Sequence, residues 1–246
     1  MSGWPGGGRR VRIGTAPGEN SIQVVVTVFA AAGSDYVFLW VLLAVAVILA
    51  LTFYYQKKRS QDLARVAQEL GLQFQAEEEK AALPDRGFDA LPLFQQSRSR
   101  SNFVHGRRAL GEMFLADVRV GSGKQSYTQT AACFHLAGRR LPAFELSPES
   151  WAHKIAQAFG YKDIDFESSP EFSKSYLLRG PDEAAVRELF GADLLNFFTG
   201  EKGWTVVGAG DWLCVYRHAR TVGAKDIRSF LEQAEAVAQP FARGRW

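Results

Sequence analysis

Cysteine and histidine are scarce in this sequence: its 246 residues include two cysteines and four histidines. Cys133 and Cys214 are far apart along the chain, so the CxxC spacing of ordinary structural zinc sites is absent. Residues four apart on one strand, such as Cys214 and His218, lie about 13 Å apart, too far to share a zinc ion. Only Cys133, His135 and Cys214 could converge, and only if their strands were neighbours. We therefore predict no metal and no cofactor, and interpret the cysteines as reduced thiols in a cytoplasmic core.

The common nucleotide and hydrolase motifs are also absent. The stretch GSGK at 121–124 lacks the glycine that a P-loop requires five positions before its Gly-Lys pair, because Val118 stands there, and Gln125 replaces the Ser or Thr that should follow. This stretch is interpreted as a turn between two strands. No GxSxG elbow occurs, and His105 and His153 are interpreted as surface or half-buried side chains. The sequence predicts no reaction, which favours a binding protein over an enzyme.

The positive charge of the chain is not concentrated in a domain. Lys and Arg number 29 against 26 Asp and Glu. Removing the six bases up to Arg59 leaves 23, and removing Glu19 and Asp35 leaves 24 acids, so the remainder is close to neutral. A nucleic-acid-binding domain would carry a basic face. We therefore predict no nucleic-acid partner.

Residues 36–55, YVFLWVLLAVAVILALTFYY, contain no charge. A helix of this length spans about 30 Å, the hydrocarbon thickness of a bilayer, and aromatic residues stand at both ends, where membrane interfaces favour them. The segment is predicted to be a single transmembrane helix, with a buried core helix as the alternative. Lys57, Lys58 and Arg59 follow the span, whereas no base occurs in the twenty residues before it. The positive-inside tendency makes these three the topology determinants and predicts an inner-membrane protein with its N-terminus outside and its C-terminal domain in the cytoplasm.

The flanking segments are expected to differ in order. Residues 1–35, which begin with the Gly- and Arg-rich MSGWPGGGRR and weakly imitate a signal peptide, are predicted to be a disordered tail or the product of a start codon placed too early. Residues 56–72 are predicted to form a juxtamembrane helical stalk that ends at Gly71. Residues 73–101 are expected to be a linker, with the cytoplasmic domain occupying 102–246.

The domain is predicted to be α+β, with a mostly antiparallel sheet and packed helices. Two hairpins are expected, GEMFLADVRV with YTQTAACFHL and a second over 203–218, and LPAFELS and SKSYLLRG are expected as further strands. Helices are predicted from Pro148 to Gly160, over PDEAAVRELFGADLLNFF, and over AKDIRSFLEQAEAVAQPF. A partial, PH-like barrel is the alternative.

An acidic cluster occurs in YKDIDFESSPEF, where Asp163, Asp165, Glu167 and Glu171 fall within nine positions. The first three alternate with Ile164 and Phe166, which is typical of a strand with one wet and one buried face. Carboxylates about 7 Å apart on such a strand could also act as an acid and base pair or hold a divalent ion if something buries them. The solvated face is the preferred interpretation, and these acids are the catalytic candidates.

A basic group occurs between positions 90 and 111, a range that contains no acid. Its members are Arg98, Arg100, Arg107 and Arg108. A solvated loop explains them, but bases near a membrane also bind anionic lipid head groups, at about 1 kcal/mol each. They are the lipid-binding candidates.

Several stretches together, the span with KKR and SQDLARVAQELGL, then LPLFQQSRSRSN, LPAFELSPES and DWLCVYR, resemble an uncharacterised family of bacterial membrane proteins. The resemblance covers about residues 36–240 and implies one N-terminal span and a cytoplasmic domain, but no activity. The function predicted is a membrane-held adaptor that binds another protein. A membrane-tethered, possibly hydrolytic enzyme that uses the acids and an anionic-lipid sensor that uses the arginines are the alternatives.

Overall fold

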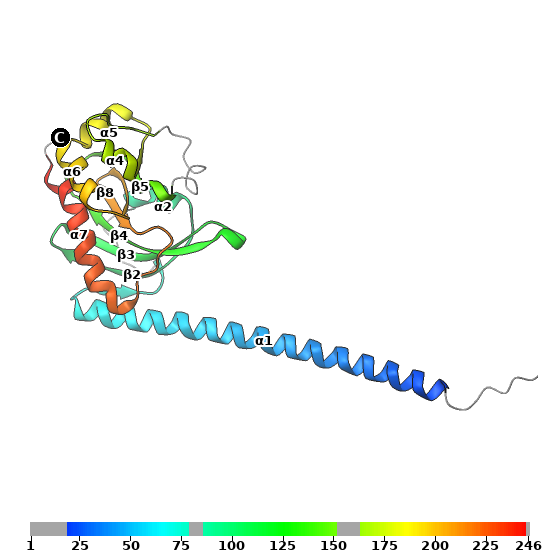
Figure 1. Ribbon diagram of the computed structural model, residues 1–246. Helices are drawn as coiled ribbons and strands as arrows, with labels where there is room; N and C mark the ends of the chain where they lie inside the picture. Colours follow the sequence, from blue (N-terminus) through cyan, green and yellow to red (C-terminus); the bar gives the residue numbers. More distant parts are fainter. Residues whose placement is uncertain (1–18, 79–85, 152–162, 245–246) are drawn as a thin grey trace, which may run out of the picture. The chain divides into compact units, whose positions relative to one another are not determined.

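The computed structural model describes residues 19–78, 86–151 and 163–244 (Figure 1). The chain divides into two compact units, Met1–Gln56 and Lys57–Trp246. The first contains most of one helix, and the second contains the sheet.

Helix α1 extends over Glu19–Glu69 and carries the apolar segment. From Tyr36 onward it is long and apolar enough to cross a membrane, with a mean hydropathy of 2.7 in its best window and none of that window buried by protein. Residues 19–35 are helical, so the prediction of a disordered tail is wrong for them. No proline occurs between Glu19 and Glu69, so the sequence there lacks the residue that breaks a helix most strongly.

Eight strands form one sheet, in the order β1-β2-β3-β4-β8-β7-β5-β6, and every pair is antiparallel. The strands are β1 (Gln73–Gln75), β2 (Ser97–Arg108), β3 (Gly111–Val120), β4 (Tyr127–His135), β5 (Leu141–Pro148), β6 (Tyr176–Arg179), β7 (Thr205–Gly210) and β8 (Trp212–Tyr216). The predicted α+β class and both hairpins are confirmed. Within the described residues β1 and β6 are the two edges, so the sheet is open and the barrel alternative is wrong.

The helical elements cover both faces of this sheet. They are η2 (Gly87–Ala90), α2 (Pro92–Gln95), η3 (Gly123–Gln125), η4 (Glu149–Trp151), α4 (Pro170–Ser175), α5 (Glu183–Leu189), α6 (Ala192–Gly200), η5 (Ala224–Asp226) and α7 (Ile227–Arg243). The single helix predicted over 181–198 is two helices, because the chain leaves the helical conformation at Phe190 and restarts after Gly191. Most of the helix predicted from Pro148 to Gly160 lies outside the described residues.

Two hydrophobic cores flank the sheet. On one face, strand residues such as Leu115 pack with Leu63 of α1 and Leu231 of α7. On the other, Phe114, Ala116 and Val118 pack with the side chains of η2 and α2. This division follows from the strand period of two, which sends successive side chains to opposite faces.

The predicted helix after the span is present and ends before Gly71, but it is not a free stalk, and the linker prediction is wrong for the described residues. Leu63 and Ala67 are fully buried in the first core, and Leu72 is nearly so, which makes the end of α1 a helix of the domain. In the predicted linker, β1 pairs with β2, and Phe88, Leu91 and Phe94 are buried in the second core. Proline and the Ser/Arg alternation led to the linker prediction, but the apolar residues between them have sheet surface to cover, and tertiary packing outweighs local propensity.

Candidate functional site

The most extensive polar network of the domain joins the end of α1 to the sheet. Arg59 donates from Nε to Asp117 Oδ2 and from Nη2 to Asp117 Oδ1, each at 2.7 Å. Its Nη1 donates to the carbonyl oxygen of Val222 at 2.8 Å. Asp117 also accepts from Asn102 Nδ2 at 2.9 Å and from Thr130 Oγ1 at 2.8 Å. This bidentate geometry, with two hydrogen bonds between one guanidinium and one carboxylate, is the strong form of an arginine–carboxylate pair.

This network, which we call the Arg59 anchor, is largely shielded from water. The Asp117 side chain is 4% exposed and that of Arg59 22%. Ser60 Oγ donates to Asn102 Oδ1 at 2.6 Å, and Asn102 has a left-handed backbone with φ of 57°, which asparagine tolerates better than most residues. Removing one partner of a buried pair leaves the other charge uncompensated. The Arg59 anchor therefore fixes the end of α1 to β2, β3 and β4.

Lys57, Lys58 and Arg59 were predicted together as topology determinants, but the structure separates them. Lys57 and Lys58 are exposed, whereas Arg59 is an interior partner of Asp117. The sequence pattern KKR could not show this because Asp117 stands 58 positions away.

The four lipid-binding candidates do not form one patch. Arg100 pairs with Glu78 and Asp89, and Arg108 pairs with Glu235. Arg98 and Arg107 are exposed, but they lie at opposite ends of β2. The structure therefore does not bring the four candidates together, because a strand of this length separates its ends by about 30 Å.

The four acidic candidates are exposed, each in a local setting. Asp163 accepts from the Leu178 backbone N–H at 3.1 Å, and Glu171 pairs with Lys174 at 3.0 Å. Ile164 and Phe166 are buried, so the predicted alternation is present, although these residues are not in a strand. The geometry gives Asp165 and Glu167 no buried setting and fits a solvated face.

Burial instead affects a carboxyl group that the sequence did not single out. Glu145 of β5 is 7% exposed and lies opposite Arg179 of β6. Glu145 Oε2 and Arg179 Nε and Nη1 are buried without hydrogen-bond partners among the described residues. Burial raises the pKa of Glu145 to about 7, and the charge of Arg179 opposes the shift. The sequence signal that could have identified Glu145 is its position as an acid within the apolar run LPAFELS.

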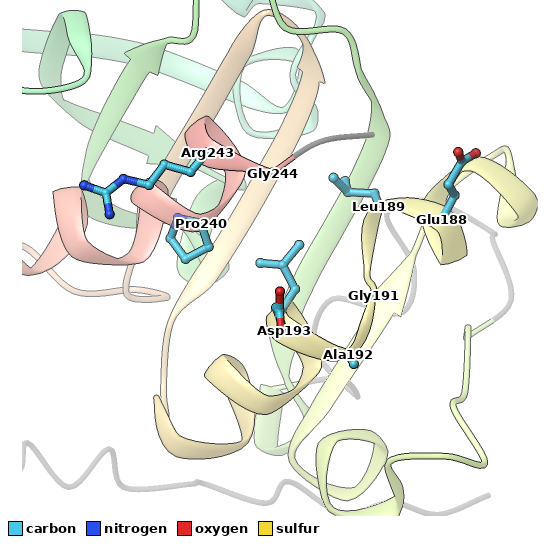
Figure 2. Close-up of a pocket in the computed structure, with 9 residues that line it drawn as sticks. Glu188, Leu189, Gly191, Ala192, Asp193, Pro240, Arg243 and Gly244 are labelled. Atoms are coloured by element: carbon cyan, nitrogen blue, oxygen red, sulfur yellow. The ribbon is translucent and has the colours of Figure 1, made fainter.

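The surface of the domain has two hollows of interest, and one of them lies beside Glu145 and Arg179. One, of about 220 Å³, lies beside Glu145 and Arg179 and is also lined by Pro92 and Gln95. A larger one, of about 650 Å³, lies between the α5–α6 junction and the end of α7; its lining includes Glu188, Asp193 and Arg243, and Figure 2 shows the two sides of this groove. Within the described residues, no group of three His, Cys, Asp or Glu is placed to hold a metal ion.

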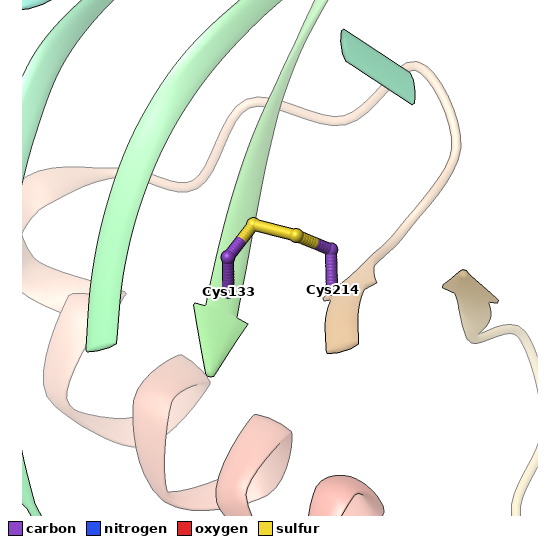
Figure 3. Close-up of a disulfide and its surroundings, with 2 residues drawn as sticks. All are labelled: Cys133 and Cys214. Carbon is purple, nitrogen blue, oxygen red and sulfur yellow. A yellow bond between two sulfur atoms is a disulfide. The ribbon is translucent and has the colours of Figure 1, made fainter. Parts of the chain in front are cut away.

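The cysteines form a disulfide, so the prediction of reduced thiols is wrong (Figure 3). β4 and β8 are neighbours, and Cys133 stands directly opposite Cys214 in their register. Both are fully buried. The 81-residue separation concealed this pairing from the sequence. His135 lies near this end of β4, but its Nε2 is 2.8 Å from Asp211 Oδ2.

Comparison with known proteins identifies a similar fold. No protein-family model matches the chain, and no curated protein matches it. Among solved structures, the chain is similar to the crystal structure of the mycobacterial trehalose monomycolate transport factor A, TtfA, with a TM-score of 0.51 and 8% sequence identity. The match covers 75% of this chain and 92% of that chain. At this identity the likeness shows the fold alone, and in this chain a helix apolar enough to span a membrane precedes the sheet.

Proposed function

We propose that this protein is a single-span inner-membrane adaptor, with its N-terminus outside and a cytoplasmic α+β domain that binds another protein at the membrane. The observation that carries the proposal is the Arg59 anchor. It ties the helix that bears the apolar segment into the core of the domain, with Leu63 and Ala67 buried beside the sheet. A module that presents a binding surface benefits from such an integral attachment to its helix.

Two further observations support an adaptor. The acids predicted as catalytic candidates are exposed, and two of them have local partners: Asp163 accepts from the Leu178 N–H, and Glu171 pairs with Lys174. The fold is similar to that of a protein whose name describes it as a transport factor, a role that suits an accessory protein. The disulfide is the feature least typical of a cytoplasmic domain, since the cytosol keeps most thiols reduced.

The proposal is tested by photocrosslinking the full chain in its own membrane. A photoreactive residue is placed at Ala192 in the groove of Figure 2 and, separately, at Gln233 on the exposed side of α7. An adaptor gives a discrete protein adduct from at least one position. Arg59→Met lowers its yield because it loosens the domain from α1, whereas Arg65→Met, at an exposed arginine of the same helix, does not.

Two results would contradict this account. If neither position gave a protein adduct, the proposed adaptor function would be contradicted. An adduct that is indifferent to Arg59→Met would show that the Arg59 anchor is not needed for it.

The tethered enzyme remains the second candidate because of Glu145. A buried carboxyl group with a pKa near 7 beside a hollow is able to exchange a proton at neutral pH. A thermal-unfolding screen of Lys57–Trp246 against metabolites and nucleotides tests it. A ligand whose stabilisation is abolished by Glu145→Gln would support the enzyme, and silence of the whole screen would weigh against it.

A further inference from the structure

A group of exposed bases lies at one end of the sheet, although its members are dispersed along the sequence. Three segments meet there and contain no acid: Ser97–Ser101, Arg119–Thr130 and Arg217–Gly223. Register places them together, since Ser97 lies opposite Val120 and Val120 opposite Tyr127. The exposed bases of this region are Arg98, Arg119, Lys124 and Arg220, together with Lys57 and Lys58 of α1. We call these six residues the basic end.

Hydrogen bonds hold the third segment against the other two. The Thr130 N–H donates to the Arg220 carbonyl oxygen at 3.0 Å, and Thr221 Oγ1 donates to the Thr128 carbonyl oxygen at 3.0 Å. Arg119 donates to Ser126 Oγ across the turn at 3.0 Å. Backbone hydrogen bonds therefore hold the segments that bear these bases in place. Figure 1 shows the β3–β4 hairpin, which contains Arg119 and Lys124, projecting past the neighbouring strands.

The end of α1 shows which end of the sheet this is. Ser60 contacts Asn102, and twelve residues later Leu72 packs against Gly106, so the chain from α1 advances along β2 from Asn102 toward its C-terminal end. Lys57 therefore lies on the side of Asn102 from which β2 begins and where the hairpin tip lies. The apolar segment ends at Tyr55, two residues before Lys57. The basic end is the end of the domain attached to that segment.

Chain length keeps the basic end close to the apolar segment. Arg59 follows Tyr55, where that segment ends, by four positions, so the bases around Arg59 are within a short length of chain from it. From Asp117, which Arg59 contacts, to Gly121 at the hairpin turn, the strand extends about 13 Å.

Acids border this end, and several of them are paired with other bases; exposed Glu77 follows Ala76, whose carbonyl oxygen accepts from the Asn102 N–H at 3.0 Å. Asp117 pairs with Arg59, and Glu78 and Asp89 pair with Arg86 and Arg100. Asp226 is the acid beside Gly223, and Lys225 stands next to it.

We propose that the basic end is a docking surface for anionic phospholipid head groups, which holds the domain against the bilayer through the β3–β4 hairpin and the Arg217–Gly223 segment. This inference rests on the proposed membrane anchoring. It corrects the lipid-binding set read from the sequence, retaining Arg98, excluding Arg100, Arg107 and Arg108, and adding bases that are distant along the chain.

The test uses the full chain in nanodiscs of phosphatidylcholine with and without phosphatidylglycerol. A fluorophore on Ser122→Cys at the hairpin tip reports contact through quenching by a nitroxide on the lipid head group. The same fluorophore on Ala137→Cys, at the opposite end of the sheet, is the positional control. The native cysteines are fully buried and do not compete for the label.

The decisive comparison is between two triple variants that remove equal charge. Arg119→Gln, Lys124→Gln and Arg220→Gln neutralise the basic end. Arg107→Gln, Arg140→Gln and Arg243→Gln remove three exposed bases near the opposite end. Each base near an anionic surface contributes about a fivefold change in binding, so the first triple should lower the ratio of docked to undocked domain on the order of a hundredfold. The second should leave it within a few fold, and added salt should weaken docking.

Each outcome of this experiment either supports or overturns the lipid-docking surface. Phosphatidylglycerol-dependent quenching at Ser122→Cys that only the first triple abolishes is the expected outcome. Equal quenching in both lipid mixtures, or equal loss in both triples, would overturn a local lipid-docking surface. A protein crosslink from the tip without lipid-dependent quenching would overturn it in favour of an acidic protein. Failure of the wild-type chain to insert into nanodiscs is detected separately by size exclusion and would overturn the anchoring as well.

Discussion

Loss of the Arg59 guanidinium should destabilise the domain far more than loss of the exposed Arg65 guanidinium on the same helix. Arg59→Met removes both hydrogen bonds to Asp117 and leaves a carboxylate that is 4% exposed with only Asn102 and Thr130 as partners. Breaking a buried pair in this way costs about 3–5 kcal/mol. Because the Arg59 side chain keeps 22% exposure, the lower value, about 3 kcal/mol, is expected.

A double-mutant cycle measured by urea unfolding of Lys57–Trp246 isolates the pair. Asp117→Asn should cost about 2 kcal/mol, because Arg59 loses its counter-charge but retains some water. The double variant should cost less than the sum of the single variants by about 2 kcal/mol. Arg65→Met, an exposed control that pairs with Asp62, should cost less than about 0.5 kcal/mol. Equal costs for Arg59→Met and Arg65→Met, or additivity in the cycle, would refute the anchor.

Three further outcomes are expected. Replacing Cys133 and Cys214 by Ala should lower the free energy of unfolding by about 4 kcal/mol, the loop-closure value for an 81-residue separation, in equilibrium unfolding without reductant; an unchanged midpoint would contradict it. The pKa of Glu145 is raised from 4.5 to about 7, so the folded state favours the protonated carboxyl group. Its contribution to the free energy of unfolding is therefore fully present below about pH 4.5, falls as the pH rises to about 7 and does not change further above that pH. The loss is about 3 kcal/mol, and Glu145→Gln should remove that part of the pH profile, whereas an unaltered profile would assign it elsewhere. Glu167→Gln should change stability by less than about 0.5 kcal/mol, and a larger effect would mean that this acid has a structural or ligand-binding partner.

Sequence periodicity was sufficient wherever one face of an element is apolar. The predicted face of the last helix, with Ile227, Phe230 and Leu231, is buried in α7. The predicted face of the first hairpin strand, from Phe114 to Val120, lies in the second core. In both cases local alternation decides which side chains leave water, and a single sequence contains that information.

Long-range pairing explains what the sequence could not show. Arg59 looks like a charge that sets membrane topology until Asp117 is placed beside it, and Cys133 looks isolated until β8 is placed next to β4. Residues 86–96 look like a linker because their proline and polar residues carry the local pattern, while Phe88 and Phe94 are needed to cover the sheet. The basic end could not be read from composition, since its bases come from separate acid-free segments.

The helix bearing the apolar segment ends inside the core of the domain, where Leu63 and Ala67 are fully buried. Hydrogen exchange of the full chain in nanodiscs tests it most directly, through the backbone amides of Arg59–Glu69. These amides are expected to exchange as slowly as those of β3 and β4, and Arg59→Met should accelerate their exchange while Arg65→Met should not. Fast exchange at Arg59–Glu69 in the wild-type chain, with the sheet still protected, would show that this segment is a tether outside the core.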